Sequence, residues 1–313
     1  MTRRTMTRTT GKRVSAFAVW AVTAVMATAG CSAISDRGAP AQSDPTASSS
    51  PRTSSEIAAE LARIEAEFAI TVGATAIGEN GRAISYRGEE RMRYASTMKA
   101  FVAAAMLAST STDERETTIR WTQAQVDAAG YSPVTSSRLD DGLTLDALAE
   151  AAVRKSDNTA TNLVMASIAG PSGVEDFLRS LGEQTSVVTR EEPELNAVVP
   201  SSDENTSTPT ALATNLHTLF QGDALDQNSR ETLLDWMSGN ATGDALIRAA
   251  APSAWAVADK SGGTGGVRND IAVVTTESGE RIYVAILTAT KDPDATYNDE
   301  AVQHVARVLL AEF

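Results

Sequence analysis

The chain has 313 residues, of which 42% are hydrophobic and 21% are charged, the composition of a soluble globular protein. Its formal net charge is −13, and without the five cations of residues 1–30 it has 22 basic against 40 acidic residues, or −18. So acidic a surface disfavours nucleic acids and anionic lipid headgroups as partners. The single cysteine, Cys31, excludes an intramolecular disulfide and a thiolate metal cluster.

Residues 1–30 have the layout of a lipoprotein signal peptide. A basic stretch to Arg13 is followed by uncharged residues and then by Thr28-Ala29-Gly30-Cys31. This ending resembles a bacterial lipobox, although Thr28 stands where leucine is usual. We therefore predict lipidation of Cys31 and a place at the outer face of the cell membrane, or secretion after cleavage. The alternative is that residues 1–30 stay uncleaved as a membrane anchor. The sequence is compatible with export by either the Sec or the twin-arginine pathway.

Residues 31–53 are mostly Ser, Ala, Thr and Pro, a composition that predicts a disordered tether. Residues 54–313 are predicted to fold. Ile57, Leu61, Ile64 and Phe68 recur at helical spacing and predict a first helix. The next two strands are expected at 71–78 and 82–86, joined by a hairpin at Asn80-Gly81.

The middle of the chain favours helices. They are expected at Leu145–Lys155, Thr159–Ile168, Gly173–Leu181, Thr210–Phe220 and Ser229–Met237. Strands return at Val257–Ser261, Ile271–Thr276 and Arg281–Thr290, and a helix closes the chain at Glu300–Phe313. We predict an α/β fold in which an antiparallel sheet is flanked by N- and C-terminal helices. An all-α part, 94–239, is inserted between the two pieces of the α/β part, 54–93 and 240–313.

Ser96 and Lys99 begin a helix that reads as buried nearly all round, because no charge follows until Asp113. Residues three apart share a helix face, so the amine of Lys99 can approach the hydroxyl of Ser96. Burial and the helix dipole should lower the pKa of Lys99. A partly neutral amine beside a serine can act as its base.

Three further stretches carry groups suited to catalysis. Ser156-Asp157-Asn158 offers a hydroxyl and an amide, or is only a helix cap. Lys260-Ser261-Gly262 places a positive charge on a strand beside a glycine, which would let a ligand approach the backbone closely. The alternative is an ordinary lysine on an exposed strand. Residues Arg190 to Asn196 begin a long polar loop. A loop of this length inside a compact chain is usually functional, and the alternative is that it is only an acidic loop exposed to solvent. His217 and His304 have no motif around them and are expected to be structural.

Together these stretches resemble the class A β-lactamases. Ser-x-x-Lys, Ser-Asp-Asn and Lys-Thr-Gly are the signature of those enzymes and of their penicillin-binding relatives. The resemblance runs from about residue 54 to the C-terminus and includes the string Glu192-Pro193-Glu194-Leu195-Asn196. It implies hydrolysis of the β-lactam ring of penicillins and cephalosporins, hence β-lactam resistance, by a monomer that needs no metal or other cofactor.

The resemblance also implies roles for individual residues. Ser96 would be the nucleophile, with Lys99 or Glu192 as its base, and Ser156 would pass a proton to the departing nitrogen. Glu192 and Asn196 would hold the water that hydrolyses the acyl-enzyme. The N–H groups of Ser96 and Gly263 would form an oxyanion hole. The resemblance implies these further substrate-binding residues: Tyr131, Asn158, Lys260, Ser261 and Arg268.

Two departures from the family pattern affect these expectations. The hairpin 262–267 is one residue short, which bears on Gly263 and on the reach of Arg268. Asn205 occupies the position of an aspartate that pairs with Arg190 in the family, and Asp203 is the candidate substitute. We expect a more mobile loop, and a higher melting temperature on Asn205→Asp.

Two other functions compete with a β-lactamase. A penicillin-binding DD-peptidase shares the first three motifs but lacks the water-holding pair Glu192 and Asn196. A non-catalytic surface lipoprotein would keep the fold as a binding module, although every catalytic position is intact here.

Overall fold

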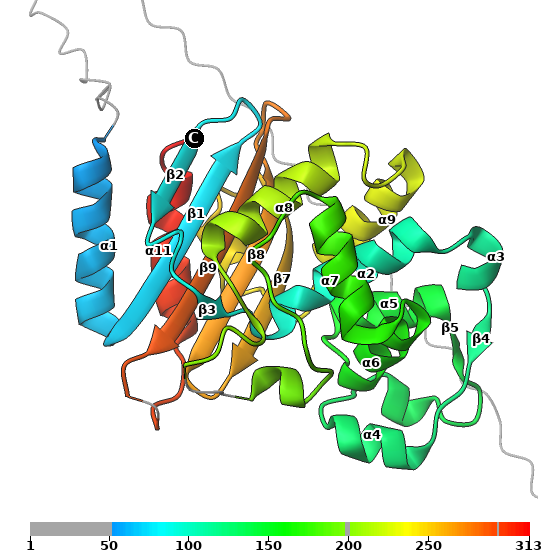
Figure 1. The fold of residues 1–313 in the computed structure, drawn as a ribbon. Coiled ribbons are helices and arrows are strands. Elements are labelled where there is room, and N and C mark those ends of the chain that lie inside the picture. The colour runs from blue at the N-terminus through cyan, green and yellow to red at the C-terminus, as the bar shows by residue number, and fades with distance from the viewer. Residues whose placement is uncertain (1–51, 198–200, 293) are drawn as a thin grey trace, which may run out of the picture. The chain divides into compact units, whose positions relative to one another are not determined.

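The computed structural model describes residues 52–197, 201–292 and 294–313, and residues 50–313 form one compact unit (Figure 1). The predicted signal peptide, Cys31 and the predicted tether up to residue 51 lie outside the described residues. In the part of the chain that is described, no helix is long and apolar enough to cross a bilayer.

Five strands form one antiparallel sheet, and the first strand of the fold lies beside the last. Their spatial order is β2 (Ala83–Tyr86), β1 (Ile70–Gly78), β9 (Arg281–Thr290), β8 (Val267–Thr275), β7 (Ala256–Thr264). β1 pairs with β9 from Ile70↔Thr290 to Gly78↔Ile282. The predicted hairpin between β1 and β2 is confirmed, with Gly81 at φ +81° in its turn.

Both faces of the sheet are buried, so its central strands are apolar almost throughout. Alternate residues of a strand face opposite sides. Thus Tyr283, Ala285 and Leu287 of β9 join one hydrophobic cluster, and Ile282, Val284 and Ile286 join the other. A central strand covered on both sides reads as a continuous apolar run, as β9 does from Ile282 to Leu287.

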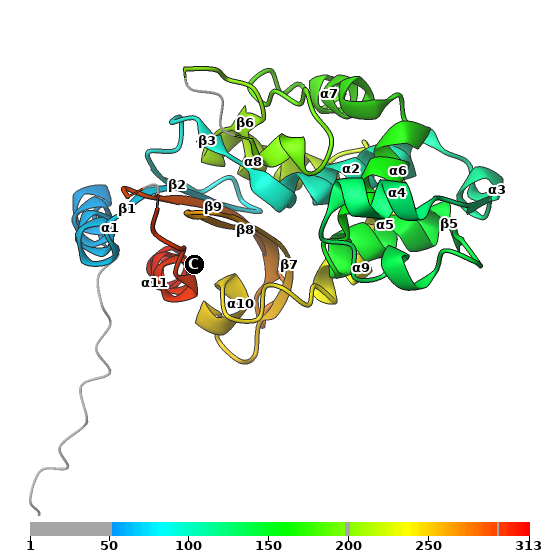
Figure 2. The same cartoon turned by 90° about the horizontal axis from the view of Figure 1, so that it is seen from below.

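Helices from both ends of the chain cover one face. The Thr53 capping box starts α1 (Ser54–Phe68), which packs with α11 (Asp299–Leu310) and α10 (Ile247–Ala250) on this side (Figure 2). On the other face lies α8 (Pro209–Gln221). His217 packs edge-on against Tyr283, and His304 packs against Phe68, so both histidines have structural contacts.

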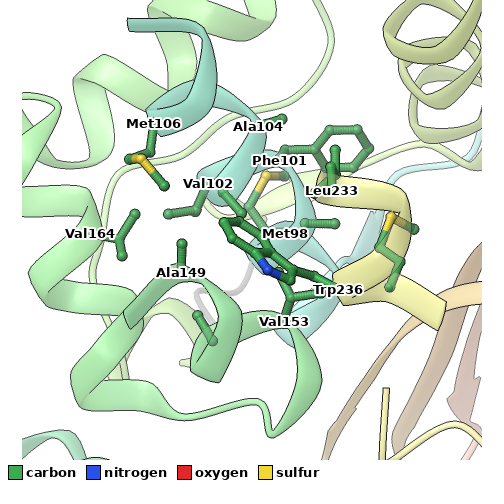
Figure 3. Close-up of a cluster of buried hydrophobic side chains, with 14 of the residues drawn as sticks. Met98, Phe101, Val102, Ala104, Met106, Ala149, Val153, Val164, Leu233 and Trp236 are labelled. Carbon is green, nitrogen blue, oxygen red and sulfur yellow. The ribbon is translucent and has the colours of Figure 1, made fainter. Parts of the chain in front are cut away.

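The remaining helices gather around α2 (Met98–Ser109), in which every residue from Met98 to Leu107 is buried. Figure 3 displays Met98, Phe101 and Val102 of α2 among side chains of α5, α6 and α9. The surrounding elements are α3 (Thr112–Arg115), β4 (Thr118–Ile119), α4 (Gln123–Ala129), β5 (Leu143–Thr144), α5 (Leu145–Arg154), α6 (Asn158–Ser167), α7 (Gly170–Ser180), α9 (Gln227–Ser238). Two short strands, β3 (Met92–Arg93) and β6 (Thr206–Ser207), pair in a separate antiparallel sheet.

The predicted fold class is confirmed, as are the five strands of the sheet and the eight long helices. The assignment of α8 to the all-α part needs correction, because α8 packs on β1, β8 and β9. The short elements α3, α4 and α10 were not expected. Each of these helices has four to seven residues, too few for a helical repeat to stand out in the sequence.

Candidate active site

A cavity of about 630 Å³ opens between β7 and the helices around α2. It is lined by eight of the residues expected to form the site, namely Ser96, Tyr131, Ser156, Asn158, Asn196, Ser261, Gly263 and Arg268. The other three, Lys99, Glu192 and Lys260, are buried and contact lining residues from behind. The structure therefore brings all eleven predicted residues together at one pocket.

Ser96 lies in a short 3₁₀ turn, η1 (Ala95–Thr97), that leads directly into α2. Strand β7 passes very close to this turn. A side chain on Gly262 would meet the carbonyl oxygen of Tyr94 at 2.9 Å and the backbone nitrogen of Thr97 at 3.1 Å. Only glycine permits this approach, which brings the β7 backbone next to the hydroxyl of Ser96.

Lys99 and Glu192 form a fully buried ion pair, with side chains 1% and 0% exposed. The Lys99 Nζ lies 3.1 Å from Oε1 of Glu192. It also donates to the carbonyl of Ser156 at 2.8 Å and to Oδ1 of Asn158 at 2.6 Å. Burial lowers the pKa of Lys99, as expected, and the Glu192 carboxylate opposes this shift. Three acceptors therefore surround an amine that can offer three N–H donors only when it is protonated.

Glu192 is held by partners on both of its carboxylate oxygens. Its Oε1 accepts a long hydrogen bond of 3.5 Å from the Ser96 hydroxyl, and its Oε2 accepts from the Asn196 amide at 2.6 Å. Asn162 fixes the backbone here, because its side chain bonds both the N–H and the C=O of Glu192, at 2.9 and 2.7 Å. One carboxylate thus links the serine, the lysine and the loop.

Ser156 lies in the left-handed region, at φ 56°, immediately before the Asp157 cap of α6. Its hydroxyl oxygen is 3.4 Å from Nζ of Lys99 and 3.2 Å from Nζ of Lys260. Burial, followed by the nearby charge of Lys99, lowers the pKa of Lys260 to about 7. A serine hydroxyl between two lysines can both give and receive a proton.

Arg268 reaches the cavity despite the shortened hairpin. Gly263 and Arg268 are cross-strand partners, and the turn between β7 and β8 is Gly265-Gly266. The guanidinium bonds Asp299 at 2.6 Å and the carbonyl oxygen of Thr242 at 3.0 Å. The pairing of β7 with β8 therefore places Arg268 directly opposite Gly263 at the cavity.

In the loop that carries Glu192, Arg190 forms a different ion pair from the one expected. Arg190 pairs with Glu204 at 3.0 Å, while Asp203 pairs with Arg91, so Asp203 is not the substitute partner. Asn205 is 1% exposed, and its Oδ1 accepts from the Thr189 N–H at 3.1 Å. Its side chain faces inward, which is why the charged pair forms one residue earlier in the chain.

Comparison with known proteins now identifies the family. Residues 53–313 match the model of the "Beta-lactamase enzyme family". "Beta-lactamase 1" of Bacillus cereus is 42% identical over 254 residues, which cover 80% of this chain and 82% of the relative. The structure of the class A β-lactamase from Clostridium kluyveri superposes with a TM-score of 0.80 at 35% identity, covering 82% of this chain and 98% of that one.

The chain belongs to the class A serine β-lactamases. A Nocardia farcinica relative, "Beta-lactamase FAR-1", is 38% identical over 80% of this chain and 81% of its own length. The β-lactamase of Streptosporangium roseum has a TM-score of 0.79 at 36% identity, covering 83% of this chain and all of that one.

Sequence reasoning missed several residues at the pocket of this β-lactamase, and three of them contact predicted site residues. Thr242 lines the cavity from the segment after α9, and Tyr297 lines it from the residues before α11, 5.0 Å from the guanidinium of Arg268. Asn162 holds Glu192 by its backbone. None lies in a recognisable motif, although Asn162 lies on α6, the helix that begins at Asn158.

Proposed function

We propose that this β-lactamase hydrolyses penicillins and cephalosporins through an ester formed on Ser96. The observation that carries the proposal is the position of Glu192, whose carboxylate lies beside the Ser96 hydroxyl and is bound by both Lys99 and Asn196. A serine, a carboxylate and a lysine in contact inside a pocket are the parts that acyl transfer needs.

Glu192 is the better candidate for the base that activates Ser96. The three N–H directions of a protonated Lys99 already point at acceptors, on Ser156, Asn158 and Glu192. A neutral amine would leave one of these buried acceptors without a donor, at a cost of about 1–3 kcal/mol. Lys99 therefore serves as the cation that holds Glu192 and the serine in place, and Glu192 takes the proton.

Attack by Ser96 places negative charge on the lactam oxygen. The N–H groups of Ser96 and Gly263 would stabilise it, since both residues line the cavity where β7 meets the α2 terminus. The departing nitrogen needs a proton, which Ser156 can give because Lys260 lies ready to replace it.

The rest of the pocket would bind the substrate. Lys260, Ser261 and Arg268 form its cationic and hydroxyl-bearing end, which suits the carboxylate of a penicillin. Tyr131, which is 59% exposed, would form a wall at the entrance. Asn158 would align the substrate's amide side chain, although its own amide already bonds Lys99 and the carbonyl of Ala129.

Release of the product needs a water activated by Glu192. Asn196 donates to Glu192, while its Oδ1 is buried and has no partner among the described residues. This unsatisfied acceptor, beside a carboxylate that is a general base, is suited to holding a water. The pair favours a β-lactamase over a DD-peptidase, in which deacylation is slow.

Steady-state hydrolysis of a chromogenic cephalosporin by the purified chain tests this function. We expect continuous turnover of many equivalents. A single stoichiometric burst with a stable adduct would favour the penicillin-binding peptidase, and no reaction at all would favour the binding module.

We also propose that the protein is a lipid-anchored monomer at the outer face of the membrane. All eleven site residues come from one chain, so a second subunit is not needed for the site. The anchor would be Cys31, and residues 31–53 would form the tether. Cys31→Ser should release the protein into the medium or leave the signal uncleaved. A membrane-bound variant of unchanged mature mass would refute lipidation.

A further inference from the structure

A second pocket, of about 280 Å³, lies where the end of α8, one face of α9 and the start of β9 meet. This α9 pocket shares no lining residue with the active-site cavity and is lined by Phe220, Gln227, Arg230, Glu231, Leu234 and Arg281. Its four residues from α9 are spaced i, i+3, i+4 and i+7, so they form one face of the helix. The volume is close to that of the smallest ordinary ligand sites, roughly 300 Å³.

Two arginines line the α9 pocket, and neither lies within 4.0 Å of a carboxylate among the described residues. Most other arginines in the described part of the chain pair with an acid, as Arg190, Arg248 and Arg268 do. In a chain of net charge −13, a guanidinium without an acidic partner is therefore the exception. Two such groups at one pocket create a local positive potential, which attracts anions.

Both arginines keep N–H donors for a ligand. Nη1 of Arg230 donates to the carbonyl oxygen of Gly222 at 2.8 Å, and its other two nitrogens have no partner in the described part of the chain. The acid beside Arg281, Glu79, is bound by other groups. Its two oxygens accept from the Gln221 amide at 2.9 Å and from the backbone N–H of Arg281 at 3.1 Å. The Arg281 guanidinium thus stays without an ion pair at the pocket.

The rest of the lining is largely apolar. Phe220 is 3% exposed and belongs to the hydrophobic core, and Leu234 packs against that core. Glu231, the one acid of the lining, already accepts from the Gln227 amide at 2.8 Å. The α9 pocket therefore offers a ligand two cationic donor groups next to an apolar surface.

We propose that the α9 pocket is a second binding site, and that it takes a phosphate monoester whose organic group is apolar. One guanidinium can bind two oxygens side by side, so two guanidiniums can engage more oxygens than the two of a carboxylate. A phosphate monoester offers three terminal oxygens and up to two negative charges. Phe220 and Leu234 would contact its organic group. The proposal goes beyond the reaction at Ser96 and does not rest on it.

Isothermal titration calorimetry of the purified chain with phenyl phosphate tests this proposal. At low ionic strength we expect a Kd of about 1 mM. Inorganic phosphate lacks the apolar group and should bind about tenfold more weakly. Benzoate, with two oxygens, should also bind more weakly, and neutral phenol should not bind measurably. No binding of phenyl phosphate at about 10 mM would overturn the proposal, as would equal binding of benzoate or phenol.

Substitution of either arginine assigns the binding to the α9 pocket. Arg230→Gln and Arg281→Gln should each weaken phenyl phosphate about tenfold, because each removes a charged hydrogen bond. Arg281→Gln keeps the test open if Arg230→Gln does not fold, since only Arg230 also bonds a backbone carbonyl. Arg307→Gln is the matched control, because Arg307 is an exposed arginine of α11 that has no acidic partner among the described residues. Its affinity should be unchanged, and equal affinities in all three variants would refute the proposal.

The active-site cavity is the competing location for phenyl phosphate, because it too is lined by an arginine. Arg268→Ala separates the two locations, since Arg268 lines the active-site cavity and not the α9 pocket. We expect this variant to bind phenyl phosphate as the parent does. Loss of binding in Arg268→Ala, with Arg230→Gln and Arg281→Gln unaffected, would place the anion in the active site and overturn the proposal.

Discussion

The two ends of the pocket are built in different ways. At the reacting end, Lys99 and Glu192 are at most 3% exposed, and each is bonded to at least two groups around it. At the other end, Arg268 and Asp299 are partly exposed, with side chains 11% and 38% accessible. Charges interact strongly where water is excluded and weakly where it enters. Substitutions at the reacting end should therefore change the chemical step by orders of magnitude, and those at the other end should change binding by smaller factors.

The largest effect is expected at Glu192. General-base assistance contributes about 10² to 10⁴ in rate. Glu192→Ala should slow both the formation and the hydrolysis of the ester on Ser96, so steady turnover falls by that factor. Any ester that does form should accumulate slowly and raise the intact mass by one ligand. Ser96→Ala should give no adduct by mass spectrometry. Turnover of Glu192→Ala at the parent's rate would refute the role of this carboxylate.

A second prediction concerns the pH dependence set by Lys260. With its pKa lowered to about 7, Lys260 is charged below that pH and neutral above it. Because kcat/KM reports the free enzyme, its value for an anionic penicillin should fall as pH rises through about 7. Lys260→Arg should move this fall to higher pH, since a guanidinium stays protonated. A flat parent profile from pH 6 to 9 would show that the lysine stays charged.

At the exposed end, Arg268→Ala should raise KM for a penicillin about tenfold and leave kcat nearly unchanged. One charged hydrogen bond to the substrate carboxylate is lost, while Lys260 and Ser261 remain. Steady-state kinetics on the acid and its ester measure this effect. An equal fall in kcat would mean that Arg268 contributes to the transition state, and the contrast between the two ends would then weaken.

The smallest effect concerns the loop that ties Glu192 to the fold. The sequence alone favours stabilisation by Asn205→Asp, but Arg190 already has a partner in Glu204, and Asn205 is 1% exposed. A carboxylate there would be buried without a cation, which reverses the expected sign. We now predict a loss of about 2 kcal/mol by thermal denaturation. A higher melting temperature would mean that Arg190 leaves Glu204 for the new aspartate.

The match between predicted and observed elements is closest where a single physical pattern dominates. Ten successive buried residues make α2 readable as a helix covered on every side, as Figure 3 illustrates. The apolar run of β9 is equally clear because both of its faces are covered. Helix α8 was placed in the wrong layer, since periodicity reveals a buried face but not the element that covers it.

The sequence by itself determined the chemistry of the site: the serine, the lysines, the glutamate and their order along the chain. Those side chains belong to short motifs in which local geometry and residue type act together. Only the tertiary structure decided that Glu204 pairs with Arg190, and that the Thr242 carbonyl accepts a hydrogen bond from Arg268. Such contacts join residues up to 26 positions apart through side-chain direction and strand register, which are set by packing of the whole fold rather than by any local pattern.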